Sequence, residues 1–250
     1  MKPQIGSEDF QRFLLDHPSG KDLWAQEKAF FDDKAERHCF GQCALQIGMG
    51  RLDCIGKAKT ARKLVLGDGP SELGHCDALG AFDALPFARS SLDAIFMPHT
   101  LEFAANPRRA LREAHSALRD NGVIAITGFN VLSLWRASLF AGAALPRARS
   151  TVSLGRLKDW LEVLGFRAGE GRFMVYTPLA RSAWWLKRCQ FLNAAGDRWW
   201  PTGAAVYGLT ARKTTYPVDL LPEKEEALEV EAWLKPAAKT AAESVRGQAR

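Results

Sequence analysis

The alternation of apolar and polar positions is clearest between residues 85 and 130. Two apolar runs typical of buried strands, Leu92–Met97 and Val123–Thr127, enclose a segment with helical spacing. Asn106 is a suitable N-cap and Pro107 suits the first helical position, after which apolar residues recur every three or four positions. This pattern predicts a strand–helix–strand crossover whose two strands are parallel and buried.

The remaining chain predicts further elements around this crossover. The predicted central helix ends at a turn, where Gly122 is expected to take a positive φ. Residues 1–40 are typical of two short amphipathic helices on either side of His17–Gly20, and we expect them to cover one edge of a sheet. Later elements are a helix at Thr151–Phe166, capped by Ser153 and stopped by Gly165, and strands at Cys43–Ile47, Lys63–Leu66, Phe173–Tyr176 and Ala204–Ala211.

Length and composition restrict the class of protein. A chain of 250 residues with 47% hydrophobic content can bury one large core, most simply as a single α/β domain with an extension. No apolar run approaches the roughly 18–20 residues that span a bilayer, and Met1–Phe10 lacks the apolar core of a signal peptide. We therefore expect a cytoplasmic protein that is either free or peripheral at the membrane.

The five cysteines favour reduced thiols over a disulfide framework, because their number is odd and no Cys-x-x-Cys pair occurs. A zinc site could be imagined only from residues whose spacing matches no common zinc motif, so no metal is expected. These residues are His38, Cys39, Cys43, His75 and Cys76.

The net charge of +6 is concentrated in one segment, since residues 136–190 hold 10 Lys and Arg against 3 Asp and Glu. The arginines and tryptophans of this segment could bind RNA through phosphates and base stacking, or an anionic membrane surface through Trp184, Trp185, Lys187 and Arg188. A solvated face with tryptophans in the core explains the same composition equally well. The aromatic and basic insertion at about 178–203 belongs to this region, whereas residues 223–250 form a charged tail that is expected to be disordered.

Three groups of residues are candidates for ligand binding because they follow predicted strands. Gly48-Met49-Gly50 ends the first strand, where glycine lets a backbone approach a phosphate or nucleoside closely. Asp68 lies 18 residues after Gly50, near the distance at which nucleoside-binding folds place a carboxylate for ribose, although a plain turn aspartate is equally plausible. Asn130 follows the strand at Val123–Thr127 and is a candidate for substrate contact by its position alone.

Residues 85–122 resemble the second half of a class I S-adenosylmethionine-dependent methyltransferase domain, particularly in the branch that methylates quinone precursors. The resemblance rests on five short motifs in matching order, and with its weaker flanks it covers about residues 40–215. These motifs are Leu85-Pro86-Phe87, Ser91-Leu92-Asp93, His99-Thr100-Leu101-Glu102-Phe103, Ala110-Leu111-Arg112-Glu113 and Leu118-Arg119-Asp120-Asn121-Gly122.

This resemblance implies a Rossmann-like, doubly wound α/β fold with a seven-stranded sheet that is mostly parallel and has an antiparallel last strand. The domain is expected to span residues 41–222 and to use S-adenosylmethionine as cofactor. The implied cofactor-binding residues are Gly48, Met49, Gly50, Asp68, Asp83, Ala84, Leu85, Met97 and Pro98. His99 is a candidate catalytic base, because its unperturbed pKa near 6.5 lets it accept a proton, although it could instead cap the following helix.

The first half of the chain departs from the family pattern. Gln46 stands where the family has a glutamate, Leu52 replaces the third glycine, and Ala81 replaces an acidic residue. Two functions therefore remain open: a methyltransferase acting on a small-molecule, lipid or quinone, or RNA acceptor, and a methyltransferase-fold binding or scaffold protein without cofactor. A nicotinamide-dependent oxidoreductase is disfavoured, because position 53 is Asp53 and not the glycine of that motif.

Overall fold

A computed structural model describes residues 7–133, 135, 150–180, 182–200 and 203–214. Residues up to Thr214 belong to one compact unit. The predicted tail at 223–250 lies outside the described residues, as do Arg136, Arg147, Arg149 and Arg181 of the basic segment.

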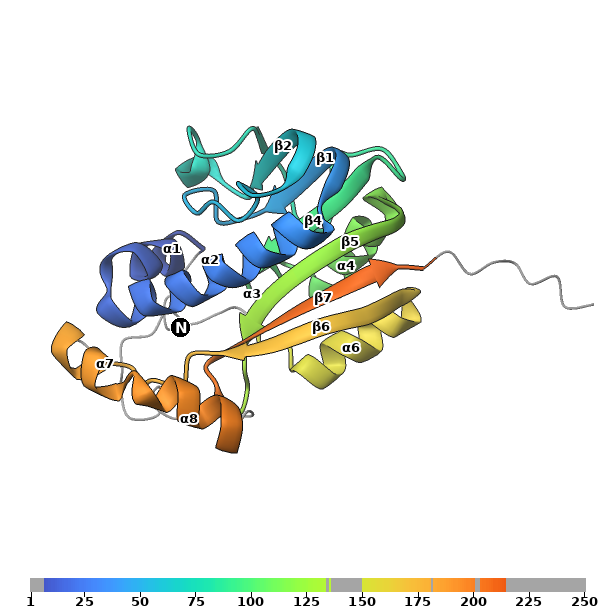
Figure 1. The fold of residues 1–250 in the computed structure, drawn as a ribbon. Coiled ribbons are helices and arrows are strands. Elements are labelled where there is room, and N and C mark those ends of the chain that lie inside the picture. The colour runs from blue at the N-terminus through green and yellow to red at the C-terminus, as the bar shows by residue number, and fades with distance from the viewer. Residues whose placement is uncertain (1–6, 134, 136–149, 181, 201–202, 215–250) are drawn as a thin grey trace, which may run out of the picture. The chain divides into compact units, whose positions relative to one another are not determined.

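A seven-stranded sheet forms the centre of this unit, with strand order β3-β2-β1-β4-β5-β7-β6 (Figure 1). All neighbouring pairs are parallel except those that β7 makes with β5 and β6. The predicted fold class is therefore confirmed, including its antiparallel last strand. The strands are β1 (Phe40–Ile47), β2 (Lys59–Gly67), β3 (Ala78–Leu79), β4 (Leu92–Pro98), β5 (Leu118–Phe129), β6 (Phe166–Met174) and β7 (Val206–Lys213).

The predicted crossover between β4 and β5 is present with its caps. Helix α4 (Pro107–Ala117) begins where expected, and the Asn106 side chain accepts a hydrogen bond from Arg109 N at 3.1 Å. The expected turn after α4 is wrong, because β5 already begins at Leu118, and Asn121, not Gly122, has the positive φ of 63°. Asparagine tolerates the left-handed region, so it can supply the irregularity in the strand.

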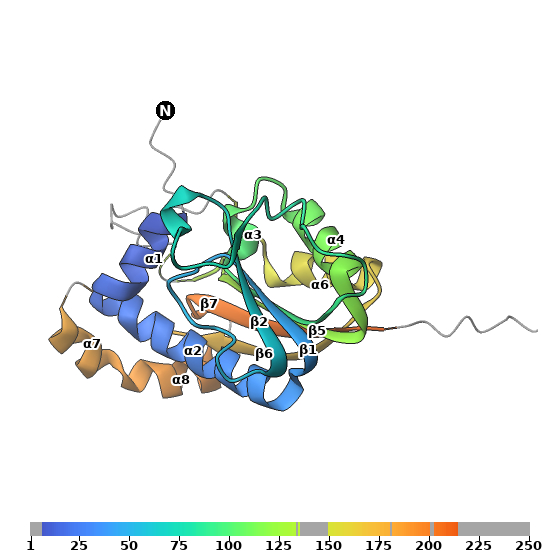
Figure 2. The same cartoon turned by 90° about the horizontal axis from the view of Figure 1, so that it is seen from above.

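Helices cover the two faces of the sheet in separate layers (Figures 1 and 2). On one face lie α1 (Ser7–Asp16) and α2 (Pro18–His38), whose Phe10, Phe30 and Phe31 share a core cluster with strand residues. The expected cover of one edge is thus wrong, since α2 contacts β5, β6 and β7 across the face. The other face carries α3 (Thr100–Phe103), α4 and α6 (Leu154–Val163), while α7 (Ala183–Cys189) lies against α2 and α8 (Phe191–Trp199) lies against β6.

Helix α6 follows its predicted signals, with Ser153 as N-cap and Gly165 at φ 85° just after its end. Strand β6 begins at Phe166, earlier than the predicted Phe173, because the chain turns directly from α6 into the sheet. Among the described residues, no helix combines the length and apolar character that crossing a bilayer requires.

The connections in the first half of the sheet contain no α-helix. Residues 48–58 join β1 to β2 through turns, and the β2–β3 connection holds only a 3₁₀ turn at Pro70–Glu72. As a result most of β2 is exposed or half-buried, whereas β5 is buried from Val123 to Phe129.

Candidate functional site

The Gly48–Gly50 turn lies at the carboxyl ends of β1, β2 and β4, where the strand order reverses between β1 and β4. Gly48 and Met49 both adopt positive φ angles, 81° and 56°. A Cβ at Gly50 would stand 2.7 Å from the His75 carbonyl oxygen, so this position accepts only glycine without rearrangement. The edge of the sheet at such a reversal is where open α/β folds bind ligands.

The side-chain amide of Gln46 is hydrogen-bonded to the backbone of this turn. Its Nε2 lies 3.0 Å from the carbonyl oxygens of both Gly48 and Met49 and 2.8 Å from that of Leu52. Its Oε1 accepts a hydrogen bond from Cys54 N at 3.0 Å, and the residue is fully buried. A carboxylate at this position could not donate to the three carbonyls, so the glutamine suits the local backbone of this chain.

The side chains of Met49 and Leu52 point into the protein core. Both are almost fully buried and share a cluster with Phe10 of α1. Arg51, by contrast, is exposed. The turn is therefore anchored on both sides, by the Gln46 amide and by these two apolar side chains.

Two carboxylates follow β2 beside the turn. Asp68 is exposed, and its Oδ1 accepts a hydrogen bond from the Ser7 hydroxyl at 3.2 Å. Glu72 is only 1% exposed, and its Oε1 accepts hydrogen bonds from Gln11 Nε2 at 2.6 Å and Gly50 N at 3.2 Å. Glu72 Oε2 has no hydrogen-bond partner among the described residues. Sequence reasoning missed Glu72, because its burial depends on α1 packing over a turn far away in the sequence.

Helix α1 is thus hydrogen-bonded directly to the candidate site. Besides the bond to Glu72, Gln11 Oε1 accepts a hydrogen bond from Arg51 N at 3.1 Å. Figure 2 shows α1 beside the loop that follows β2. The Asp68 and Glu72 carboxylates and the Arg51 backbone N–H, which a ligand could bind, are therefore hydrogen-bonded to side chains of α1.

The loop before β4 brings Asp83, Ala84 and Leu85 to the same end of the sheet. Asp83 and Leu85 are half-buried and Ala84 is exposed. The buried Phe82 ring packs against the turn, since a Cβ at Gly48 would stand 3.0 Å from it. Sequence reasoning did not single out Phe82, whose only signal is an aromatic residue amid small and polar ones.

Met97 and Pro98 end β4 and are buried. The Met97 side chain belongs to the core cluster on the α3–α4 face. Just beyond them, the Thr100 hydroxyl donates to the Ile47 carbonyl oxygen at 2.5 Å, which ties the end of β4 to the end of β1.

His99 is buried between two glutamates and has a positive φ of 49°. Its Nδ1 lies 2.5 Å from Glu102 Oε2, and its Nε2 lies 2.8 Å from Glu27 Oε1. Glu102 also accepts a hydrogen bond from Phe129 N. The cluster therefore joins α2, the end of β4 and the end of β5.

The electrostatics of this cluster favour a protonated imidazole. Burial alone would lower the pKa of His99, but the carboxylates of Glu27 and Glu102 outweigh it and raise the pKa to about 10. With both ring nitrogens bonded to carboxylates and no exposed surface, His99 cannot take a proton from a substrate in this conformation. The geometry instead suits a positioning role, because the imidazolium holds α2 against the end of β4.

Asn130 uses its side chain to bind backbone. Its Nδ2 donates to the Ala204 carbonyl oxygen at 3.0 Å, and its Oδ1 accepts from Leu132 N at 3.2 Å. These contacts fix the start of β7 at the carboxyl end of β5, and the predicted contact of Asn130 with substrate stays a prediction.

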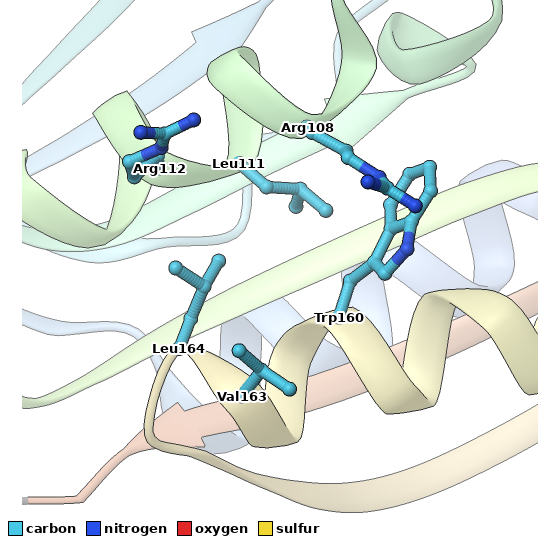
Figure 3. Close-up of a pocket in the computed structure, with 6 residues that line it drawn as sticks. All are labelled: Arg108, Leu111, Arg112, Trp160, Val163 and Leu164. Atoms are coloured by element: carbon cyan, nitrogen blue, oxygen red, sulfur yellow. The ribbon is translucent and has the colours of Figure 1, made fainter.

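The described tryptophans that follow β5 do not all lie on the surface. The Trp135 indole is buried and donates to the Thr177 carbonyl oxygen at 2.8 Å, whereas Trp184 and Trp185 are more than half exposed. A groove of about 390 Å³ between α4 and α6 is lined by apolar side chains, by Arg112 and by Arg108, whose guanidinium lies over the Trp160 ring (Figure 3). None of the residues predicted to bind ligand lines this groove.

Comparison with known proteins supports the methyltransferase interpretation at the level of the domain. Residues 56–126 match the family described as Methyltransferase domain. The chain is also 33% identical, over 150 residues, to the uncharacterized protein YafS of Escherichia coli (strain K12). That match covers 56% of each protein, so the chain spans little more than half the length of this curated relative.

Solved structures share the fold at low sequence identity. A chain from the complex between the Haloferax volcanii Trm112 methyltransferase activator and a candidate methyltransferase has a TM-score of 0.58 at 13% identity, covering 84% of this chain and 97% of its own. A SAM-dependent methyltransferase from Archaeoglobus fulgidus has a TM-score of 0.52 at 18% identity, with coverage of 76% and 93%. The chain therefore has the class I methyltransferase fold.

Proposed function

We propose that this chain binds S-adenosylmethionine at the carboxyl edge of β1, β2 and β4 and transfers its methyl group to an acceptor. The observation that carries the proposal is the meeting of the Gly48–Gly50 turn with Asp68 and Glu72 where the strand order reverses. The match of residues 56–126 to methyltransferase domains supports the same ligand.

The residues at this edge fit an adenosyl ligand. Glu72 Oε2 is buried and lacks a hydrogen-bond partner among the described residues, and such an oxygen is stabilised by accepting a bond from a hydroxyl or ammonium group. Gly48 and Gly50 already let the Phe82 ring and the His75 carbonyl oxygen approach the turn closely, so in the proposal the ligand enters beside these groups. In the proposal the backbone of Gly48, Met49 and Gly50 contacts the ligand, and Asp68 and Glu72 accept hydrogen bonds from its hydroxyl groups. Asp83, Ala84 and Leu85 flank the adenine, and Met97 and Pro98 line the bottom of the binding site.

The cofactor supplies an activated methyl group, so the protein has to position the acceptor and exclude water. His99 contributes by holding α2 and the ends of β4 and β5 in register through Glu27 and Glu102. Asn130 keeps the neighbouring start of β7 in place. Neither residue is proposed to remove the acceptor proton.

Ligand binding has to compete with α1 in this proposal, because Ser7 and Gln11 already donate to Asp68 and Glu72. Isothermal titration of the full chain with S-adenosylmethionine and S-adenosylhomocysteine tests the proposal. We expect saturable heat, and an affinity lower by about tenfold or more in Glu72→Gln, because a charge-assisted hydrogen bond is lost. Glu162→Gln, an exposed change on α6, is the matched control and should bind like the parent.

No heat at millimolar ligand from a folded sample would reject the proposal. It would favour the second candidate, a scaffold protein with this fold and no cofactor. The observation behind that candidate is the pairing of both carboxylates with α1, together with helix-free connections around the turn.

The methyl acceptor can belong to one of three chemical classes in this proposal. A lipid or quinone acceptor is suggested by the sequence resemblance to quinone-precursor methyltransferases. An RNA acceptor, or a small molecule of another kind, fits the same fold. Incubation with methyl-labelled S-adenosylmethionine and separate lipid, RNA and small-molecule extracts distinguishes them by the fraction that takes up label.

A further inference from the structure

Helices α7 and α8 present a continuous exposed aromatic face. Gln190 at their junction keeps helical angles, φ −58° and ψ −28°, so the helical spacing runs through both. The exposed aromatic side chains lie between 52% and 81% open to solvent. These aromatic residues are Trp184, Trp185, Phe191, Trp199 and Trp200. Together with Lys187, Arg188 and Arg198 they form what we call the α7–α8 face.

The opposite side of these helices packs on the protein. Leu186 is buried, Asn193 Oδ1 accepts a hydrogen bond from Tyr176 N at 2.8 Å, and Gly196 lies against the Tyr176 ring. Trp184, Arg188 and Phe191 are spaced four and three residues apart and so share the outer side. The usual arrangement is inverted here, because the outer side carries the larger apolar groups.

The outer side is also basic. Lys187, Arg188 and Arg198 are exposed, and none of them forms an ion pair within the part of the chain that the structure describes. Both guanidinium groups lie over indole rings, Arg188 at 4.9 Å from the Trp184 centroid and Arg198 at 6.0 Å from the Trp199 centroid. Cations and indoles are therefore interleaved on one surface.

We propose that the α7–α8 face docks on the surface of a lipid bilayer that contains anionic headgroups. Tryptophan combines a large apolar ring with one N–H donor, which suits the boundary between acyl chains and water, and the neighbouring cations attract anionic lipid. Helices of this type lie in the plane of the membrane with their apolar side inserted. The proposal is independent of methyl transfer.

The shape of this face favours a membrane over nucleic acid. Proteins that bind single strands without sequence preference combine stacking aromatics with a positively charged groove that follows the backbone. Here four of the exposed rings stand on two short helices and Trp200 follows directly after them, so five large rings accompany three cations. Apolar insertion therefore contributes more than phosphate contacts would.

Sedimentation of the full chain with vesicles tests the proposal. We expect binding to equimolar phosphatidylcholine and phosphatidylglycerol vesicles, weaker binding to phosphatidylcholine alone, and quenching of tryptophan fluorescence by lipids brominated in the acyl chains. The double variant Trp184→Ser with Trp185→Ser should lower the partition coefficient by about tenfold or more, since two interfacial rings are lost. Phe40→Ser is the matched control, because Phe40 is an exposed ring under the Lys59 ammonium at the start of β1.

A second pair of variants tests the charge. Lys187→Gln with Arg188→Gln should remove the preference for anionic vesicles, whereas Arg156→Gln with Lys158→Gln on α6 should preserve it. Circular dichroism checks that each variant is folded. Absence of vesicle binding at low salt overturns the proposal, as does binding to polyuridylate RNA in its place, or a dimer that the tryptophan variants dissociate into monomers without any vesicle binding.

Discussion

The two halves of the sheet are stabilised in different ways. Between β4 and β5 the chain makes a regular crossover, in which α3 and α4 bury apolar side chains against the strands. Between β1 and β3 no α-helix intervenes, and the turn after β1 is held by the amide of Gln46 and the buried carboxylate of Glu72. The turn of the first half thus depends on a few polar contacts in addition to its buried Met49 and Leu52 side chains, whereas the crossover of the second half depends on apolar packing.

This difference indicates where single substitutions should matter most. Apolar packing is spread over many contacts, so it tolerates exchange of similar side chains. A buried polar group is costly once its partner is lost, because it has already given up water. The strongest tests therefore address the buried polar clusters.

The largest effect is expected for His99→Gln, at the junction of the two halves. The change leaves Glu27 and Glu102 buried together without a cation, which should cost about 3–5 kcal/mol of unfolding free energy. Urea denaturation followed by circular dichroism measures it. Glu27→Gln, which keeps the imidazolium and one carboxylate, should lose less; an equal or greater loss would contradict the assigned roles.

The same cluster predicts how stability depends on pH. The folded state raises the pKa of His99 from its ordinary 6.5 to about 10, so it binds a proton that the unfolded chain releases between these values. Its stabilisation is complete below pH 6.5 and is lost as the pH rises through 10, a change of at most a few kcal/mol. Burial also raises the pKa of Glu102, which acts in the same direction. Denaturation curves across this range should show a decline that is smaller in His99→Gln, because the contribution of the imidazole is lost while that of the buried carboxylates remains.

Gln46→Glu tests the polar support of the first half. The introduced carboxylate cannot donate to the carbonyls of Gly48, Met49 and Leu52, so about 1–3 kcal/mol should be lost. Gln190→Glu, the same chemical change at an exposed position, should stay within about 0.5 kcal/mol. A stabilised Gln46→Glu variant would show that the turn prefers the family residue.

The smallest effect is expected in the regular half. Asn106→Ala removes the N-cap of α4 and should cost about 1 kcal/mol, measured by thermal denaturation. Ser153→Ala at α6 should cost less, because its hydroxyl accepts from Arg156 N at the longer distance of 3.4 Å. A larger loss of stability for Ser153→Ala than for Asn106→Ala would contradict the expected link between a short capping distance and a strong cap.

Sequence reasoning predicted the second half well because its signals are local. The Asn106 cap, the apolar stripe of α4 and the flanking strands all follow from neighbouring residues. The early start of β6 and the extension of β5 to Leu118 were missed, because strand ends depend on pairing with β7 and β4. Tertiary pairing overrides local preference there.

The candidate site was predicted only in part for the same reason. The Gly48–Gly50 turn and Asp68 follow from their places after strands, and the structure brings them to one edge. Glu72 and Gln11 could not be found, since they meet across 61 residues through the packing of α1. The expectation for His99 depended on exposure, which Glu27 of α2 removes.

The brevity of β3 has a consequence for the solution behaviour of the protein. Its two residues pair with Leu66 and Gly67, so the outer backbone of β2 from Lys59 to Leu64 has no neighbouring strand among the described residues. An open strand of this kind can template association with other chains. Lys59, Arg62 and Lys63 place like charges along it, so two copies repel each other edge to edge, and apolar replacements at these positions would remove a safeguard against aggregation.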